Sequence, residues 1–293
     1  MKPRTALAFA ALCLLSGSAW MIDQFYPEIL SGPLRTAAHD GFLAILFALA
    51  SLRSRRKRLT QRLWLELALC GIALFALPII LATGSGGKVA SLTIILISTS
   101  IPAIVVFLTA QTVFGGDDNP MRLLLPALCG LGGASLLLPF TWPVSLSGEV
   151  WFIAIILSAI LSALAAIHLH RILPRAGILH ALTVLCVSAA IASALCYRVG
   201  YSPILAWTHT QLLIELLRTL ILEAPIFFLL IYLIREMNPI AISARYVLIP
   251  LITIIESYLV ERPHAEWTTF VGVLLMAFSA AILIRTPPRD ITL

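Results

Sequence analysis

Charged residues are scarce in this sequence. Only 12% of its 293 residues are Asp, Glu, Lys or Arg, whereas 60% are hydrophobic and the mean hydropathy is +1.00. A soluble globular domain has about 25% charged and about 45–50% apolar residues. No polar stretch of the chain approaches the length of a domain. These shortages exclude a soluble protein and predict an all-α polytopic membrane protein.

Cysteines are also few, and the five that occur (Cys13, Cys70, Cys129, Cys186 and Cys196) all fall in apolar segments. Their spacing fits neither a disulfide framework nor a metal site, so we interpret them as small packing residues. No His, Asp or Glu cluster has the spacing of metal ligands, and no glycine-rich phosphate loop follows a strand. No convincing pair of nucleophile and base is present either. The sequence therefore predicts no metal, no cofactor and no enzymatic activity.

Positive charge exceeds negative charge, with a net charge of +6 and a pI near 9.3. In a soluble protein this excess would suggest a nucleic-acid partner. Here the basic residues gather in short loops, above all in the run Arg53–Arg58, which we interpret as a topological anchor. Placing both termini in the cytoplasm puts most of the twenty Lys and Arg residues on the inner side. The predicted partner is therefore the lipid bilayer and not nucleic acid.

Apolar runs long enough to cross a bilayer, which takes about 20 residues, recur along the chain. Ten transmembrane helices are expected, at residues 5–23, 34–52, 63–82, 89–110, 122–140, 151–169, 177–197, 213–234, 240–259 and 267–284. The first run also resembles a secretory signal with a small-residue cleavage site, but it fits better as a retained first span. A wetter connector, residues 141–150, separates one set of five, within 1–140, from a second set, within 151–293.

Two sets of five spans imply a particular topology. Because five is odd, the second set must enter the membrane with the opposite orientation, as in the two inverted five-helix repeats found among secondary transporters. Pro102 inside the fourth run and Pro250 inside the ninth occupy matching places, although prolines are ordinary in membrane helices. Between the seventh and eighth runs, Tyr201–Gln211 is expected to lie on the membrane surface.

The eighth run contains Glu215, Arg218 and Glu223 inside an otherwise apolar stretch. A charge at the middle of a bilayer costs at least about 2.5–3.5 kcal/mol, so such residues need partners or water. At about 100° per residue they share one half of the helix. Glu223, beside a kink expected at Pro225, is the best candidate for a buried and partly unpaired carboxyl that could exchange a proton. The alternative is an ion pair of Glu223 with Arg218 or Arg245 that fixes the eighth helix against the ninth.

Other polar and aromatic residues have two interpretations each. Trp20 could stack on a substrate or belong to the aromatic belt at the membrane interface. Ser98 could line a cavity or hydrogen-bond its own helix backbone. Arg245 could reach the cytoplasmic interface, with Tyr246 facing another side of the helix, and both are kept as candidates for substrate binding. Glu256 is expected to be exposed to water. The group formed by Arg35, His39 and Asp40 is interpreted as a wet helix end, with a polar vestibule as the alternative.

Several local patterns occur in the order known from one family. They are Leu14–Trp20, Pro33-Leu34-Arg35, Leu157–Arg171, Asn238-Pro239 and Tyr246–Pro263. In these the chain resembles the EamA-like transporters of the drug/metabolite transporter superfamily. The resemblance implies a bacterial inner-membrane carrier with two five-helix repeats and alternating access. It also implies a cavity lined by helices one, three, four, six, eight and nine.

The function expected from these observations is secondary transport of a small molecule. Charges of both signs within the membrane suit export of small amino-acid-like or amphiphilic metabolites, with protons as a candidate coupling ion. One alternative is uptake of a quaternary amine such as choline, since Ala37–Asp40 looks like the second-span motif of that branch of the family. Another is a non-transporting membrane scaffold. Either a monomer or a homodimer is compatible with the sequence.

Overall fold

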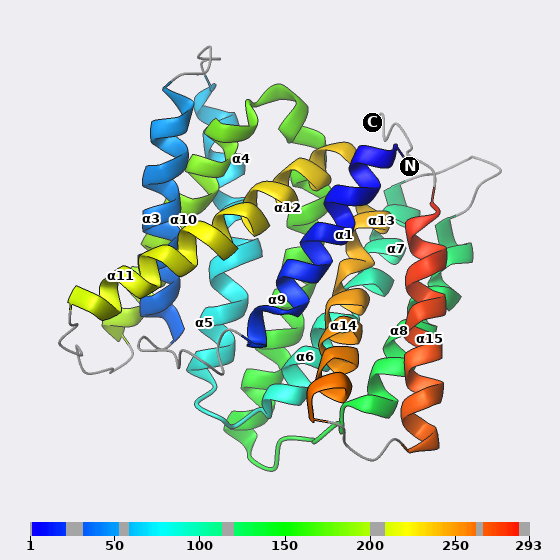
Figure 1. The fold of residues 1–293 in the computed structure, drawn as a ribbon. Coiled ribbons are helices and arrows are strands. Elements are labelled where there is room, and N and C mark those ends of the chain that lie inside the picture. The colour runs from blue at the N-terminus through cyan, green and yellow to red at the C-terminus, as the bar shows by residue number, and fades with distance from the viewer. Residues whose placement is uncertain are drawn as a thin grey trace.

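The computed structural model describes residues 2–21, 32–52, 59–112, 120–199, 209–261 and 266–286, and every regular element within them is a helix (Figure 1). Eight helical segments in these residues are long and apolar enough to cross a membrane. The all-helical class is thereby confirmed, and the architecture fits a polytopic membrane protein. The run Arg53–Arg58 and residues 201–208 of the expected surface segment lie outside the described residues.

The first half of the chain contains α1 (Pro3–Gly17), α3 (Gly32–Ser51), α4 (Gln61–Gly71), η1 (Ile72–Ala76), α5 (Leu77–Gly84), α6 (Ser91–Thr99), α7 (Ile101–Thr112), η2 (Pro120–Leu123) and α8 (Leu124–Leu137). The second half contains α9 (Leu146–Ile172), η3 (Leu173–Arg175), α10 (Ile178–Val199), α11 (His209–Arg218), η4 (Thr219–Glu223), α12 (Ala224–Glu236), α13 (Pro239–Ser243), α14 (Arg245–Glu261) and α15 (Trp267–Ile284). Because α9 begins at Leu146, the connector is shorter than expected. Two predicted spans fall on the more polar α3 and the short α8, so the number of ten remains a prediction.

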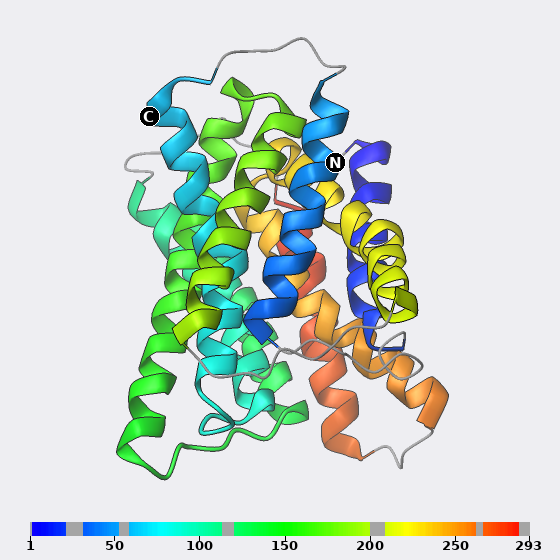
Figure 2. The same cartoon turned by 90° about the vertical axis from the view of Figure 1, so that its left-hand side faces the viewer.

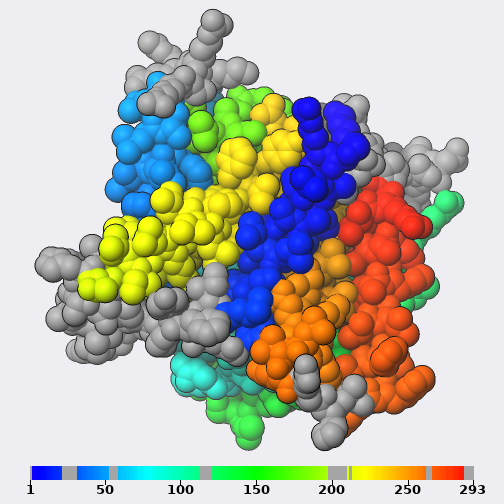
Figure 3. All heavy atoms as spheres, viewed as in Figure 1, coloured from blue at the N-terminus to red at the C-terminus, as the bar shows by residue number. Residues whose placement is uncertain are grey.

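Helices that are distant in the sequence pack against each other. α3 lies along α10 (Figure 2), α8 lies along α15, and α1 lies between α12 and α14 (Figure 3). A Cβ atom added to Gly133 on α8 would lie 2.6 Å from the carbonyl oxygen of Gly272 on α15. The absence of side chains at Gly130 and Gly133 therefore allows α8 to pack closely against α15. The start of α1 and the end of α15 lie on the same side of the bundle (Figure 1).

Two of the long helical segments contain a π-helical turn. η1 lies between α4 and α5, η4 lies between α11 and α12, and each is followed by a proline, Pro78 and Pro225 respectively. A proline has no N–H to close the preceding helical turn, and a π turn accommodates one extra residue in the helix. The irregularity expected at Pro225 therefore takes the form of a wider turn that ends at Glu223.

The bundle is closed at the end where α9 and α12 terminate. Leu169, Leu173 and Leu233 are 0% exposed there, and Ile234 is 1% exposed. The Nδ1 atom of His170 lies 2.6 Å from the carbonyl oxygen of Ile234 and joins the two helices. By contrast, many large apolar side chains on the outside of the bundle are exposed, as a surface that faces lipid requires.

Candidate functional site

A histidine on α3 joins two carboxyl groups of the opposite helix. The Nδ1 atom of His39 lies 2.8 Å from Oε1 of Glu223, and its Nε2 atom lies 3.0 Å from Oε2 of Glu215. His39 is 6% exposed and Glu215 is 7% exposed. The interpretation of this part of α3 as a wet helix end is therefore wrong, because packing against α10 and η4 removes His39 and Asp40 from solvent.

The π turn explains why both carboxyl groups reach one ring. Glu215 and Glu223 are eight positions apart, which separates them by about 80° around a regular α-helix. One extra residue in η4 turns the face back by about 100°, so the two side chains come to lie almost one above the other. Local geometry at η4 therefore builds the site.

The three groups together hold one exchangeable proton. A neutral imidazole has a single N–H and can donate only one hydrogen bond. Two contacts with carboxyl oxygens therefore require either an imidazolium ion between two carboxylates or a neutral ring beside one protonated carboxyl. In both cases the net charge of the group is the same, and removal of the proton breaks one of the two contacts.

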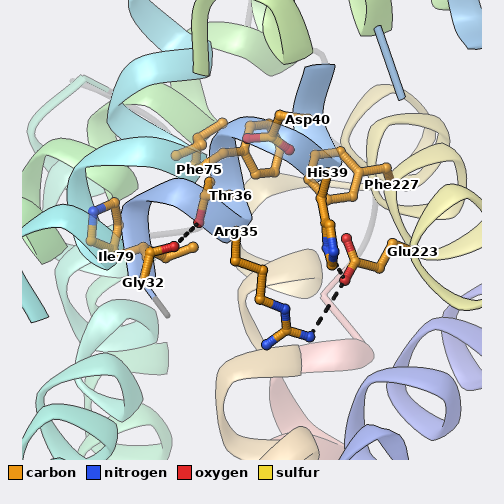
Figure 4. A pocket seen from close by; sticks show the side chains of 11 residues that line it. Gly32, Arg35, Thr36, His39, Asp40, Phe75, Ile79, Glu223 and Phe227 are labelled. Carbon is orange, nitrogen blue, oxygen red and sulfur yellow. Dashed lines mark hydrogen bonds and ion pairs between the residues drawn. The ribbon is translucent and has the colours of Figure 1, made fainter. Parts of the chain in front are cut away.

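Glu223 is not the partly unpaired carboxyl that the sequence suggested. Besides His39, its Oε1 atom faces the Nη2 atom of Arg35 at 3.9 Å (Figure 4). Arg218 also lies near enough to Glu223 for their charges to interact. The side chains of Arg35 and Glu223 are 17% and 21% exposed, so this contact lies at the edge of water. Two partners of Glu223, His39 and Arg35, thus come from α3, which sequence spacing could not reveal.

A cavity of about 470 Å³ adjoins this cluster (Figure 4). Its walls come from α3, from η1 with α5, and from η4 with α12. The lining residues are Gly32, Arg35, Thr36, His39, Asp40, Leu74, Phe75, Pro78, Ile79, Glu223 and Phe227. Polar groups of α3 face one part of the cavity and apolar groups face the other. The rings of Phe75 and Phe227 stack with their centroids 4.6 Å apart. Of the residues first proposed for substrate binding or coupling, only Glu223 lies in this lining. Arg35, His39 and Asp40, for which a polar vestibule was the alternative interpretation, line it as well.

Trp20 and Glu256 form a separate group near the end of α1. The indole Nε1 of Trp20 donates to Oε2 of Glu256 at 3.0 Å, and the Ser18 hydroxyl donates to Oε1 at 2.5 Å. The Thr253 hydroxyl donates to the Gly17 carbonyl at 3.0 Å. These contacts tie α1 to α14. Glu256, expected to be wet, is half-buried and accepts two hydrogen bonds.

The remaining candidates also lie away from the cavity. The Ser98 hydroxyl donates to the Ile94 carbonyl of its own helix at 3.1 Å. The guanidinium of Arg245 donates to the hydroxyl of Tyr246 at 2.8 Å and lies 4.6 Å from the centre of its ring. The two residues therefore do not face different sides, because the long arginine side chain folds back. Within the described residues, no group of His, Cys, Asp and Glu has a geometry that could hold a metal ion.

Comparisons with known proteins add information on the fold alone. No protein-family model matches the chain, and no curated protein matches it. A solved structure described as "Crystal structure of protein" is similar, with a TM-score of 0.76 and 16% sequence identity over 96% of this chain and 98% of that chain. At this identity the likeness supports a shared fold and no shared activity.

Proposed function

We propose that this chain is a secondary carrier for small amino-acid-like or amphiphilic metabolites. The observation that carries the proposal is the cavity beside η4, into which Glu223 and its partners on α3 project. A scaffold has no need of ionisable residues beside a hollow, because charges within a membrane are costly. The earlier resemblance adds the bacterial inner membrane as the expected location.

An inverted repeat of ten spans is part of this proposal. Under it, α3 and α10 are the second spans of the two halves and α8 and α15 are the fifth spans. The two members of each pair pack together, as related helices close to a two-fold axis in the membrane plane would. The third span of each half supports the same symmetry. In both, a five-residue π turn is followed by one residue and then a proline, Pro78 or Pro225.

The side of the cavity follows from charge. Helix ends on the side of Pro3 and Ile284 carry Arg4, Arg62, Arg171, Arg235 and Arg285, so the positive-inside rule makes this side cytoplasmic. The cavity lies along the first half of α3, toward the other side, while apolar packing closes the cytoplasmic end. The proposed state is therefore an outward-facing one of an alternating-access cycle, with the His39 cluster exchanging the coupling proton.

Flux into proteoliposomes with and without a pH gradient tests this function. Solutes from a metabolite screen, first selected by thermal shift, would be assayed with the wild type, Glu223→Gln and the control Glu66→Gln, whose carboxylate pairs with Arg62 outside the cavity. We expect Glu223→Gln to abolish flux or its pH dependence without loss of membrane insertion. Unchanged flux and pH dependence in Glu223→Gln would eliminate Glu223 as the coupling site, and absence of flux for every selected solute would favour a scaffold.

A further inference from the structure

Asp40 contributes a buried carboxyl group to the cavity. It is 2% exposed, and its Oδ2 atom is buried without a hydrogen-bond partner among the described residues. The neighbouring groups are already engaged, since His39 bridges Glu215 and Glu223, and Arg35 faces Glu223. A buried carboxylate charge without compensation is costly. Asp40 therefore needs a positive group or a proton from outside the described residues.

The wall that faces these polar groups is apolar and partly aromatic. Leu74, Phe75, Pro78, Ile79 and Phe227 form it. The stacked rings of Phe75 and Phe227 offer flat surface to a hydrocarbon or aromatic group, and aromatic faces also attract cations. The cavity volume of about 470 Å³ lies within the range of about 300–1,000 Å³ that is usual for small-molecule sites.

We propose that the cavity binds a protonated primary amine bearing a compact apolar or aromatic group. The ammonium group donates to Asp40, and the apolar group packs against Phe75 and Phe227. Of the two solute classes proposed above, this selects amphiphilic amines over amino-acid-like zwitterions. It rests on the proposed carrier function for transport, whereas binding can be measured without it.

The charge of the lining disfavours the other solute classes. The carboxylate of a zwitterion would lie beside Asp40 and Glu223, and the guanidinium of Arg35 is already held by Glu223. A quaternary amine has no N–H with which to satisfy Oδ2 of Asp40. A neutral alcohol leaves the carboxylate charge uncompensated. The cavity should therefore prefer ligands whose positively charged nitrogen carries N–H donors.

Calorimetric binding to the purified protein at neutral pH tests this with four probes of similar shape: phenethylamine, trimethyl(phenethyl)ammonium, L-phenylalanine and phenethyl alcohol. We expect phenethylamine to bind at least about tenfold more tightly than each of the others, as a charged hydrogen bond to a buried group is worth about 1.5–3 kcal/mol, a difference of about tenfold or more. Equal affinities, or tighter binding of the zwitterion, would overturn the proposal. Because this series uses the wild type, it does not depend on a variant folding.

Matched variants locate the site. Asp40→Asn should weaken phenethylamine binding at least about tenfold, whereas Glu66→Gln should not change it. Phe75→Leu should weaken it severalfold, whereas Phe270→Leu, at a side chain 61% exposed on α15, should not. Undiminished binding by a folded Asp40→Asn protein would overturn the assignment.

Measurements of solute flux distinguish the proposed carrier function from the proposed amine-binding site. If phenethylamine binds through Asp40 but neither it nor any selected solute crosses the membrane, the amine site stands and the carrier fails. If another solute class is transported while phenethylamine does not bind, the carrier stands and the amine site fails.

Discussion

At the scale of single residues, His39 is the centre of the site because it contacts carboxyl groups at two levels of the opposing helix. Its contacts with Glu215 and Glu223 are short and lie largely out of water. Interactions of this kind depend on each other, because removal of one member leaves the others with unsatisfied buried groups.

A double-mutant cycle measures this dependence. His39→Gln and Glu215→Gln, alone and together, should show a coupling free energy of about 1–3 kcal/mol in reversible unfolding from detergent micelles. The pair Arg62 and Glu66 serves as control, since the side chain of Arg62 is 90% exposed and such surface pairs couple weakly. Additive effects of His39→Gln and Glu215→Gln would contradict the bridged arrangement.

The sequence identified the two carboxyl groups of this site on the eighth run, but not the role of the residues on α3. Glu223 was predicted because a carboxyl group in a long apolar run requires an explanation. His39 and Asp40 were visible as polar residues of the second span, but their environment was misjudged. The partners of His39 lie 176 and 184 positions away along the chain, and no local pattern reports contacts at such separations.

At the scale of elements, the π turn η4 determines which carboxyl groups meet His39. Insertion of one alanine directly after Ile221, a residue 69% exposed within η4, adds a ninth position between Glu215 and Glu223 and should rotate Glu215 by about 100° away from His39. We expect the coupling between His39 and Glu215 to disappear while that between His39 and Glu223 persists. Deletion of Ile221 is the control, because seven positions of regular α-helix also place the two carboxyl groups within about 20° of each other and should keep both contacts. Retained coupling to Glu215 after the insertion would show that η4 does not set this geometry.

Close packing of α8 on α15 leads to a second prediction for elements. Gly133→Ala should destabilise the protein by about 1–3 kcal/mol, because its Cβ would overlap the carbonyl oxygen of Gly272. Gly132→Ala, next to it, meets nothing within 4 Å and should be neutral or slightly stabilising. Unfolding of both variants in parallel provides the measurement, and equal stabilities would contradict the packing.

Helix positions followed from hydropathy, because a long apolar run leaves the backbone no other way to satisfy its hydrogen bonds in lipid. The π turns did not follow from it. One extra residue hardly changes the length or the average hydropathy of a long helix. It does rotate every later side chain by about 100° around the helix axis. Pro78 and Pro225 were the only local sign of such turns.

At the scale of the whole molecule, the proposed orientation can be tested through exposed positions at opposite ends. In a background without native cysteines, Val144→Cys, in the connector, should react with a membrane-impermeant maleimide in intact cells, since Val144 is fully exposed. Arg62→Cys, at the start of α4, should react only after the cells are permeabilised. The reverse pattern would invert the topology and place the cavity on the cytoplasmic side.

The bond between the Trp20 indole and Glu256 has a practical consequence. An indole that donates to a carboxylate emits at a wavelength set by that negative neighbour, so its fluorescence reports whether α1 and α14 remain in contact. The chain contains five further tryptophans, so replacing them with phenylalanine would leave Trp20 as an internal optical sensor of helix separation. Rapid mixing with a solute would then make the motion visible in real time without any attached dye.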